Sequence, residues 1–291
     1  MYDDLTVQLT REQTALYLER IGLVEEAGLF REDDGLQAGE LGLKPDLRLL
    51  DKLIYAHQIT VPFENLSIIL EGKGVELGTE YLFDKIVTRR RGGYCFELNK
   101  SFNSLLLGLG YKTTAHVGRI FSSPYLRPRV HRINLVYLDE GKGVEPYFSD
   151  VSSGGTQPAQ AVPLKTGTFT DFLDKTFRFN YGEVHHDQGI RENTWVLYRI
   201  NDDGDALGLV AFEEQEQYEV DFVPHNHFTS THPESRFVSN VVVNQRRVDG
   251  HASITNDLFR LVAEGQEPLE RDVSDPNVRA EVLESYFGIV L

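Results

Sequence analysis

The sequence predicts an α+β fold in which helices come first, antiparallel strands follow and a mixed segment ends the chain. Two observations support this prediction. Apolar residues before position 111 recur at helical spacing, most clearly along residues 95–109. From residue 112 the chain changes to segments rich in Val, Ile, Thr, Tyr and Phe, separated by Gly, Asp and Pro. Consecutive strands without intervening helices favour an antiparallel sheet or barrel.

The first helices have recognisable starts. Thr10 followed by Gln13 is a capping box, and apolar residues at helical spacing come after it. Pro45 precedes a second periodic apolar run at residues 47–54. The segment 31–44 between these two helices is acidic and rich in glycine, so we expect it to be a loop.

The clearest helix follows Gly92 and Gly93. Its apolar positions are 3, 4, 3 and 4 residues apart and form one stripe, which consists of Cys95, Leu98, Phe102, Leu105 and Leu109. Gly108 and Gly110 are suitable residues to end this helix. The pattern therefore places Cys95 in the first turn.

The later elements are predicted from composition and from helix-start signals. We expect strands at residues 112–121, 130–138, 146–151, 194–200, 207–213 and 237–248. The chain then returns to a helix, for which Asp275 is the predicted N-cap, Pro276 the first helical residue and Gly288 the end.

Composition excludes several classes of protein. The 291 residues include 29 Lys and Arg and 45 Asp and Glu, a formal net charge of −16 that repels nucleic acid. No apolar run approaches the roughly 18 residues of a membrane span. The residues 1–4 show no basic start of a secretory signal. We therefore expect a cytoplasmic protein with no nucleic-acid or membrane partner.

The single cysteine, Cys95, excludes an internal disulfide and any metal site with several cysteines. Unpaired N–H groups at a helix start favour a thiolate, and the arginines at 89–91 add positive charge, so this position suits a nucleophile. The alternative is an inert cysteine that fills the apolar stripe of its helix.

A nucleophilic cysteine needs a base, and the base needs an orienting group. His131 lies in a strand-like run that would hold it rigidly, and Asp150 ends another apolar strand, where burial favours a paired carboxylate. The alternatives are a structural histidine and a turn aspartate. Residue spacing alone does not decide between these interpretations.

Several segments of the chain form one ordered set of motifs. Residues 61–66 contain Pro-Phe-Glu-Asn, and residues 91–99 read Arg-Gly-Gly-Tyr-Cys-Phe-Glu-Leu-Asn. The segments around His131 and Asp150 follow, then Pro-Glu-Ser-Arg-Phe within residues 231–237 and Tyr-Phe-Gly-Ile at residues 286–289. Together they resemble the upstream motif, the nucleophile motif, the other two triad motifs, the Pro-x-Ser-x-Phe segment and the C-terminal ending of the arylamine N-acetyltransferase family.

This resemblance implies a three-part fold with a cysteine-protease-like Cys-His-Asp core. Residues 1–110 would form a helical bundle that carries the nucleophile. Residues 111–215 would form an antiparallel β-barrel that carries the histidine and the aspartate. Residues 216–291 would form an α/β lid.

The resemblance also implies a ping-pong acyl transfer with Cys95, His131 and Asp150 as the triad. Cys95 would attack acetyl-CoA, and an arylamine, arylhydrazine or N-hydroxyarylamine would then accept the acyl group. His131 would move protons and Asp150 would orient it. Acyl-CoA is a co-substrate here, with no resident cofactor. The alternatives are a thiol hydrolase or transglutaminase-like enzyme with the same triad, and a non-catalytic binding protein.

Further residues match family positions that support the site. Glu64 and Arg91 match a pair that braces the site, and an apolar-flanked glutamate requires such a partner. Asn99 belongs to the same support. Phe63 and Val117 match positions that line the substrate pocket, although Phe63 also suits a plain core position.

The sequence departs from the family after Asp150, where the usual Asp-x-Gly-Phe-Gly is replaced by Asp-Val-Ser-Ser-Gly-Gly. Ser153 stands in place of an aromatic pocket wall. We expect a roomier or more polar substrate pocket, which would also admit propionyl-CoA or malonyl-CoA.

CoA phosphates require a local basic patch in so acidic a protein. The candidates are Arg127 and Arg129 just before the histidine, then Lys112, Arg119 and Arg132, together with the backbone of residues 154–156. Each of them is equally well interpreted as a solvated charge or a turn.

Two histidine pairs have side chains that could ligate a metal ion, His185 with His186 and His225 with His227. No third ligand has suitable spacing, and Pro224 and Asn226 indicate a loop, so we expect no metal site. We expect a monomer or a weak homo-oligomer.

Overall fold

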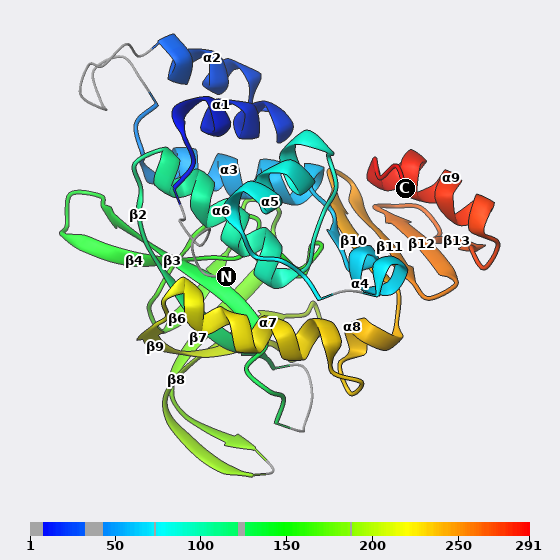
Figure 1. Cartoon of the computed structure of the whole chain (residues 1–291). Coiled ribbons are helices and arrows are strands. Elements are labelled where there is room, and N and C mark those ends of the chain that lie inside the picture. Colours follow the sequence, from blue (N-terminus) through cyan, green and yellow to red (C-terminus); the bar gives the residue numbers. More distant parts are fainter. Residues whose placement is uncertain (1–7, 33–42, 73, 122–125, 187) are drawn as a thin grey trace.

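The computed structural model describes residues 8–32, 43–72, 74–121, 126–186 and 188–291. Figure 1 shows helices in the first part of the chain, a strongly curled sheet after them and a second sheet with one helix at the end. The predicted α+β order is therefore confirmed. In the described residues, no helix combines the length and the apolar character needed to cross a membrane.

The helical part consists of α1 (Arg11–Arg20), α2 (Val24–Glu32), α3 (Leu47–Thr60), α4 (Leu66–Glu71), α5 (Thr79–Phe83), the π-helical turn η1 (Asp84–Thr88) and α6 (Cys95–Gly108). The capping box predicted for α1 is confirmed, because the Gln13 N–H donates to Thr10 Oγ1 at 3.2 Å and Gln13 Oε1 accepts from the Thr10 N–H at 3.0 Å. Residues 31 and 32 of the predicted loop belong to α2, and residues 33–42 lie outside the described residues.

The larger sheet has eight antiparallel strands in the order β5-β4-β3-β2-β9-β8-β7-β6. They are β2 (Lys112–Ile120), β3 (His131–Asp139), β4 (Val144–Ser149), β5 (Val162–Pro163), β6 (Gly167–Thr170), β7 (Thr176–His186), β8 (Gly189–Ile200) and β9 (Ala206–Glu216). In these described strands the two ends, β5 and β6, do not pair, so the predicted barrel is an open half-barrel. Helix α6 packs on β2 and β3.

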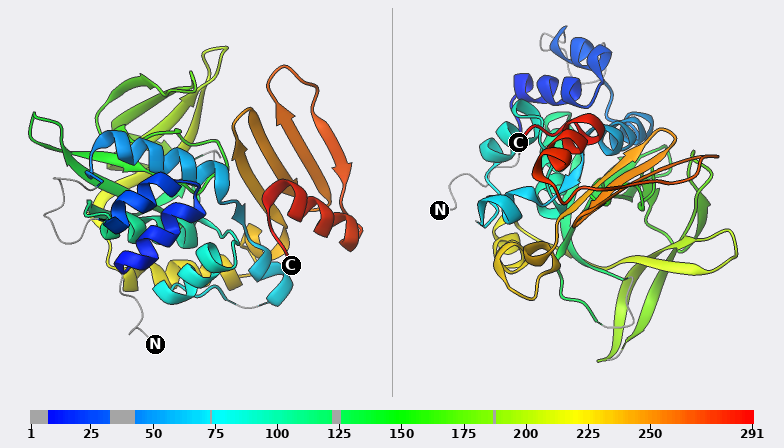
Figure 2. Two further views of the ribbon diagram at one scale, coloured as in Figure 1. Left: turned by 90° about the horizontal axis from the view of Figure 1, so that it is seen from above. Right: turned by 90° about the vertical axis from the view of Figure 1, so that its right-hand side faces the viewer.

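The second sheet has the order β1-β10-β11-β12-β13 and combines distant parts of the chain. Its strands are β1 (Phe63–Glu64), β10 (Val242–Arg247), β11 (Gly250–Thr255), β12 (Leu258–Ala263) and β13 (Leu269–Asp272). Figure 2 shows α9 (Pro276–Phe287) lying against this sheet. The predicted caps of α9 are confirmed: Asp275 accepts from two backbone N–H groups, and Gly288 ends the helix with φ 65°.

Three helical elements follow β9 along the chain and precede β10. They are η2 (Glu219–Asp221), α7 (Phe222–Thr231) and α8 (Arg236–Ser239). Two local predictions were wrong here. The strand expected at residues 237–248 begins only at Val242, because the Ser235 side chain caps the short helix α8 instead. The loop expected at Pro224 and Asn226 is part of α7, since proline is tolerated in the first turn of a helix.

The predicted division of the chain at residues 110 and 215 stays a prediction. The half-barrel strands run from Lys112 to Glu216, close to those limits. However, Phe63 and Glu64 pair with β10 through the second sheet, so the first part of the chain also contributes to the last. The apolar core is shared in the same way, since Phe222 and Val242 are buried in one cluster with residues of α1, α3 and α6.

Candidate active site

Cys95 is the first residue of α6, as the apolar pattern predicts, and two glycines shape the chain before it. A Cβ on Gly92 would lie 2.0 Å from the carbonyl oxygen of Pro62, and a Cβ on Gly93 would lie 2.8 Å from the Glu97 side chain. No side chain can be accommodated at such distances. The glycines therefore allow the chain to pass close to its neighbours immediately before the sulfur.

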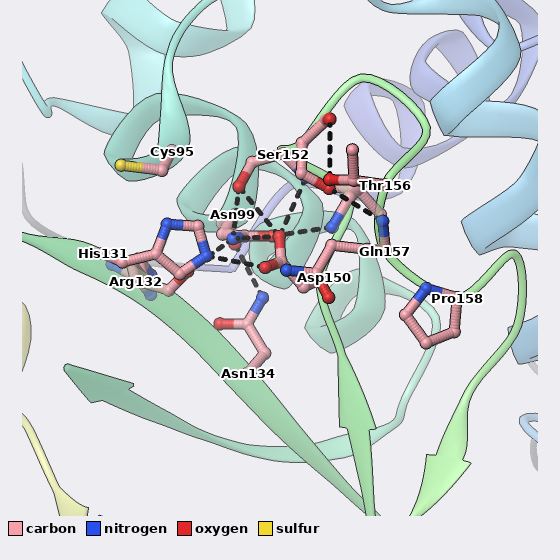
Figure 3. Close-up of polar contacts among 12 residues, drawn as sticks. Cys95, Asn99, His131, Arg132, Asn134, Asp150, Ser152, Thr156, Gln157 and Pro158 are labelled. Atoms are coloured by element: carbon pink, nitrogen blue, oxygen red, sulfur yellow. Dashed lines mark hydrogen bonds and ion pairs between the residues drawn. The ribbon is translucent and has the colours of Figure 1, made fainter. Parts of the chain in front are cut away.

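His131 and Asp150 come together from the ends of neighbouring strands. His131 is the first residue of β3, and Asp150 follows the last residue of β4. His131 Nε2 lies 2.6 Å from Asp150 Oδ2, and both side chains are almost completely buried. Figure 3 shows the remaining ring nitrogen, Nδ1, on the side of Cys95. The ring is thus positioned between a carboxylate and a thiol.

Burial and charge determine the protonation of this pair. Burial disfavours the imidazolium, but the Asp150 carboxylate and the contact with Cys95 outweigh burial and raise the pKa of His131 to about 10. Burial also disfavours the Asp150 carboxylate, but His131 and hydrogen bonds from Asn99 and Ser152 hold the pKa of Asp150 below its ordinary value. The pair is therefore an imidazolium with a carboxylate at neutral pH.

Cys95 is 3% exposed, and its Sγ lies 3.4 Å from the carbonyl oxygen of Val130, the residue before His131. The helix N-terminus at Cys95 and the imidazolium of His131 both place positive charge beside the sulfur. The thiol is thus in a position that suits a nucleophile, although it is also part of the buried core.

Asn99 fixes the aspartate from the next turn of α6. Its Nδ2 lies 2.9 Å from Asp150 Oδ1 and 2.5 Å from the carbonyl oxygen of Arg132. Its Oδ1 accepts from the backbone N–H of Val151 at 3.0 Å. Asn99 therefore ties the strand that contains His131 to the residues that follow β4 (Figure 3).

Ser152 and Gln58 also hold the aspartate, and sequence reasoning missed both of them. The Ser152 N–H and hydroxyl both donate to Asp150 Oδ1, at 2.9 and 2.8 Å. Gln58 Nε2 on α3 donates to the Asp150 carbonyl at 3.2 Å. The Asp-x-Ser spacing is a signal for the Ser152 contact, because an aspartate commonly accepts from the backbone two residues on. No local pattern indicates Gln58.

A second buried network lies beneath the start of α6. Arg91 donates to Glu64 Oε1 through two nitrogens, at 3.1 and 2.8 Å, so these residues form the ion pair expected from the sequence. Lys85 Nζ lies 2.7 Å from Glu97 Oε1 and 4.0 Å from Glu64 Oε1. Burial lowers the pKa of Lys85, but the two carboxylates outweigh burial and raise it.

The sequence analysis did not predict a role for Glu97 or Lys85. Glu97 Oε2 accepts from the Tyr94 N–H at 3.0 Å, so this carboxylate holds the backbone on the N-terminal side of Cys95. A glutamate at the third position of a helix is a recognised helix-start signal, and it could have indicated this role. That Glu64 and Arg91 brace the site remains a prediction.

The predicted substrate residues lie on segments that adjoin those of the triad, and their role remains a prediction. Phe63 is on β1, 8% exposed, with its ring centroid 5.7 Å from that of Phe237. Val117 is buried on β2, next to Gly118, which pairs with His131 in the sheet. Ser153 Oγ accepts from a backbone N–H within its own turn, that of Gln157, at 3.2 Å.

Some of the predicted phosphate ligands already have partners. Arg132 is completely buried, and both terminal nitrogens donate to Glu219 at 2.7 Å. This arginine is therefore not available to a phosphate. The turn at residues 154–156 presses against β10, because a Cβ on Gly154 would lie 2.3 Å from Asn244 Cβ. Lys112 is exposed at the opposite end of β2 from Arg119.

The histidine pairs lie on two separate elements. His185 and His186 are on β7, and His225 and His227 are on α7 rather than on a strand or loop. Within the described ranges, no group of three or more His, Cys, Asp or Glu side chains is arranged to hold a metal ion.

Comparison with known proteins places this chain in a family. A family model described as N-acetyltransferase matches residues 46–291. An arylamine N-acetyltransferase of Escherichia coli K12 is 30% identical over 80% of this chain and 79% of its own length. An N-malonyltransferase of Fusarium pseudograminearum is 29% identical over 84% of this chain and 79% of its own length.

Solved structures of the same family have a similar fold. The arylamine N-acetyltransferase of Mycobacterium marinum in complex with CoA superposes with a TM-score of 0.76 at 27% identity, covering 94% of this chain and 91% of that one. Its fold, with N-terminal helices, a curled antiparallel half-barrel and a C-terminal α/β region, is the fold described above. This chain belongs to the arylamine N-acetyltransferase family of acyltransferases.

Proposed function

We propose that this acyltransferase transfers an acyl group from an acyl-CoA to an arylamine, arylhydrazine or N-hydroxyarylamine through a thioester on Cys95. One observation supports this most strongly: the buried hydrogen bond of 2.6 Å between His131 Nε2 and Asp150 Oδ2, with the other ring nitrogen on the side of Cys95. The relatives named as arylamine N-acetyltransferases, one of them in complex with CoA, support the substrate classes.

In the first half-reaction the Cys95 sulfur attacks the carbonyl carbon of the donor thioester. The bond between that carbon and the CoA sulfur breaks, and the acyl group is left on Cys95. The protonated His131 stabilises the attacking thiolate and then gives its proton to the departing CoA sulfur. The products are the acylated enzyme, free CoA and a neutral imidazole.

In the second half-reaction the amine nitrogen attacks the Cys95 thioester. His131 removes a proton from that nitrogen, the carbon–sulfur bond breaks and the Cys95 thiolate is restored beside an imidazolium. Asp150 fixes the ring through Nε2, so that Nδ1 faces the reacting atoms in both steps. Because both substrates use the same sulfur in turn, the kinetics should be ping-pong.

The test is an intact-mass measurement within seconds of mixing the protein with acetyl-CoA and no amine, with Cys95→Ala as the control. We expect one acetyl adduct on the wild type only, which an arylamine then removes as the N-acetyl product. Absence of an adduct, together with absence of CoA release when the amine is present, would refute the proposal. Removal of the adduct by water as fast as by amine would favour a thiol hydrolase instead.

We further propose that the donor pocket admits propionyl or malonyl groups as well as acetyl. The family resemblance implies an aromatic side chain at the position of Ser153, and the Ser153 hydroxyl is held within its own turn by the Gln157 N–H. A serine leaves volume and polarity that a phenyl ring would fill. The Fusarium relative is named as an N-malonyltransferase, which is consistent with donor variation in this family.

Donor preference can be measured as kcat/KM for acetyl-, propionyl- and malonyl-CoA on the wild type, Ser153→Phe and Ser153→Ala. We expect Ser153→Phe to lower the values for the two larger donors relative to acetyl-CoA. Ser153→Ala removes the hydroxyl without filling the space and should preserve acceptance of propionyl-CoA. Unchanged ratios in Ser153→Phe would exclude a wall position for this residue.

The remaining parts of the proposal concern the acceptor and the assembly. Phe63 and Val117 are proposed to line the acceptor side, and Glu64, Arg91 and Asn99 to support the triad.

The single cysteine and the net charge of −16 support a cytoplasmic protein that acts as a monomer or a weak homo-oligomer. Light scattering after size exclusion would measure the assembly.

A further inference from the structure

A basic cavity lies at one end of the half-barrel, outside the triad. It has a volume of about 230 Å³ and lies between the end of β2, the segment before β3 and strands β7, β8 and β9. Four arginines line it: Arg119, Arg127, Arg129 and Arg191. Figure 1 shows the hairpin of β7 and β8 projecting away from the helices beneath α7.

The cavity has more positive charge than its own carboxylates neutralise. Among its described lining residues the only carboxylate is Glu213, which forms an ion pair with Arg129. Arg119 donates to the carbonyl oxygen of Arg127 at 2.6 Å, a contact that does not neutralise either charge. In a chain with 45 acidic and 29 basic residues, four arginines around one cavity are a local concentration of positive charge, although Arg191 also borders a neighbouring hollow lined by Glu183, Glu192 and Glu214.

The positive charges of these arginines also repel one another. Burial lowers the pKa of Arg119, and the neighbouring charges of Arg129 and Arg191 lower it further. This mutual repulsion is relieved when an anion enters. Guanidinium groups bind phosphate oxygens through paired N–H donors, so several arginines around one cavity suit a phosphate in particular.

The remaining walls and the size of the cavity define the ligand further. Phe121, Val184 and Phe212 provide apolar walls, which strengthen the attraction between the arginines and an anion. At about 230 Å³ the cavity is smaller than the ~300–1,000 Å³ typical of sites that enclose a whole small molecule. It therefore suits the charged part of a larger ligand.

One residue, Val130, links the lining of the cavity to the nucleophile. Cys95 Sγ lies 3.4 Å from the Val130 carbonyl oxygen, and Arg129, which lines the cavity, directly precedes Val130. A ligand with its reactive end at the sulfur and a phosphate some distance away can therefore reach both places. An acyl-CoA has this form, with a thioester at one end and phosphates on the nucleotide at the other.

We propose that this arginine cavity binds phosphate groups of the CoA nucleotide and so orients the acyl donor toward Cys95. The proposal rests on the proposed function, because it assigns the phosphate subsite of the same donor. Arg119 and Arg191 are the residues to test, since neither belongs to the triad or to its hydrogen-bond network.

The experiment is calorimetric titration of the wild type, Arg119→Gln, Arg191→Gln and Arg260→Gln with CoA, dephospho-CoA and pantetheine. Arg260 is the matched control, because it lies on β12 in the other sheet, in a surface ion pair with Glu270. We expect each cavity variant to weaken CoA binding about tenfold, with pantetheine binding unchanged and Arg260→Gln like the wild type. Added salt should weaken CoA binding to the wild type more than to Arg191→Gln.

Dephospho-CoA, which lacks the 3′-phosphate, identifies the group that is bound. If the variants weaken dephospho-CoA as much as CoA, the cavity holds the diphosphate; if they weaken CoA alone, it holds the 3′-phosphate. Equal affinities for CoA in all four proteins would overturn the proposal. So would arginine-dependent binding of inorganic phosphate that CoA does not displace.

Acylation by p-nitrophenyl acetate, a donor without phosphate, separates this proposal from the function on which it rests. The cavity variants should react with it as fast as the wild type. Arginine-dependent CoA binding without any acyl adduct would overturn the proposed function and leave the phosphate site. An adduct from acetyl-CoA with the same KM in Arg119→Gln, Arg191→Gln and the wild type would overturn the phosphate site and leave the proposed function.

Discussion

Replacing Asn99 by alanine would disconnect three parts of the site at once. The change removes the donors to Asp150 Oδ1, at 2.9 Å, and to the Arg132 carbonyl, at 2.5 Å. It also removes the acceptor of the Val151 N–H at 3.0 Å. Asn99 is completely buried, so water is poorly placed to replace these partners.

The expected loss of stability follows from the groups left without partners. A buried donor or acceptor without a partner costs about 1–3 kcal/mol. The Val151 N–H and the Arg132 carbonyl are two such groups, whereas Asp150 retains Ser152 and His131. We therefore expect Asn99→Ala to lower the free energy of unfolding by about 3–5 kcal/mol.

Asn103→Ala is the matched control, because Asn103 lies one turn later on α6 and is also buried. Its Oδ1 accepts a hydrogen bond from the half-buried Thr113 hydroxyl at 2.6 Å, and losing this contact should cost only about 1 kcal/mol. Urea unfolding followed by circular dichroism measures both variants. Equal losses, or a loss below about 1.5 kcal/mol for Asn99→Ala, would refute this reasoning.

The same variant should also react more slowly with the acyl donor. Asp150 would lose one of its constraints, and small misplacements of a catalytic group cost roughly ten- to a hundredfold in rate. The single-turnover rate of Cys95 acylation measures this effect, taken with the pH profile of that rate. If Asn99→Ala acylates at the wild-type rate over the whole profile, Asn99 supports the fold alone.

Three further changes test other parts of the structure. Arg91→Met leaves the fully buried Glu64 without its main partner and should cost about 3 kcal/mol in urea unfolding, and adding Glu64→Gln should recover part of that loss. A methyl group at Gly92 would lie 2.0 Å from a backbone carbonyl oxygen, so Gly92→Ala should cost about 1–3 kcal/mol or more and slow acylation; a neutral effect on both would contradict the tight approach. The folded-state pKa of His131, about 10, exceeds the ordinary 6.5, so its stabilising contribution is complete below pH 6.5 and is lost as the pH rises to about 10. The unfolding free energy should fall over that range in the wild type and fall much less in Asp150→Asn; the same slope in both proteins would exclude this pair as the cause.

Local signals in the sequence were sufficient for the elements that carry the nucleophile and end the chain. The apolar stripe from Cys95 to Leu109 predicts α6 to within one residue. Asp275, Pro276 and Gly288 delimit α9, because capping depends on contacts within a few residues. Local signals failed at Phe237 and in α7, where a β-prone composition and a proline occur in segments that are helical.

Motifs and caps are local features of the chain, so the order of amino acids was enough to indicate the helix-first arrangement, the family and the residue types available for catalysis. It did not indicate strands β7 and β11–β13 or helices α7 and α8. Which of these groups meet depends on how the strands and helices pack together. The bond between His131 and Asp150 depends on the register of β3 and β4, and the partners of Asn99 come from the segments flanking those strands. The arginine cavity likewise combines Arg119 of β2 with Arg191 of β8, which no spacing in the sequence relates, because strand pairing over long separations is set by the packing of the whole sheet.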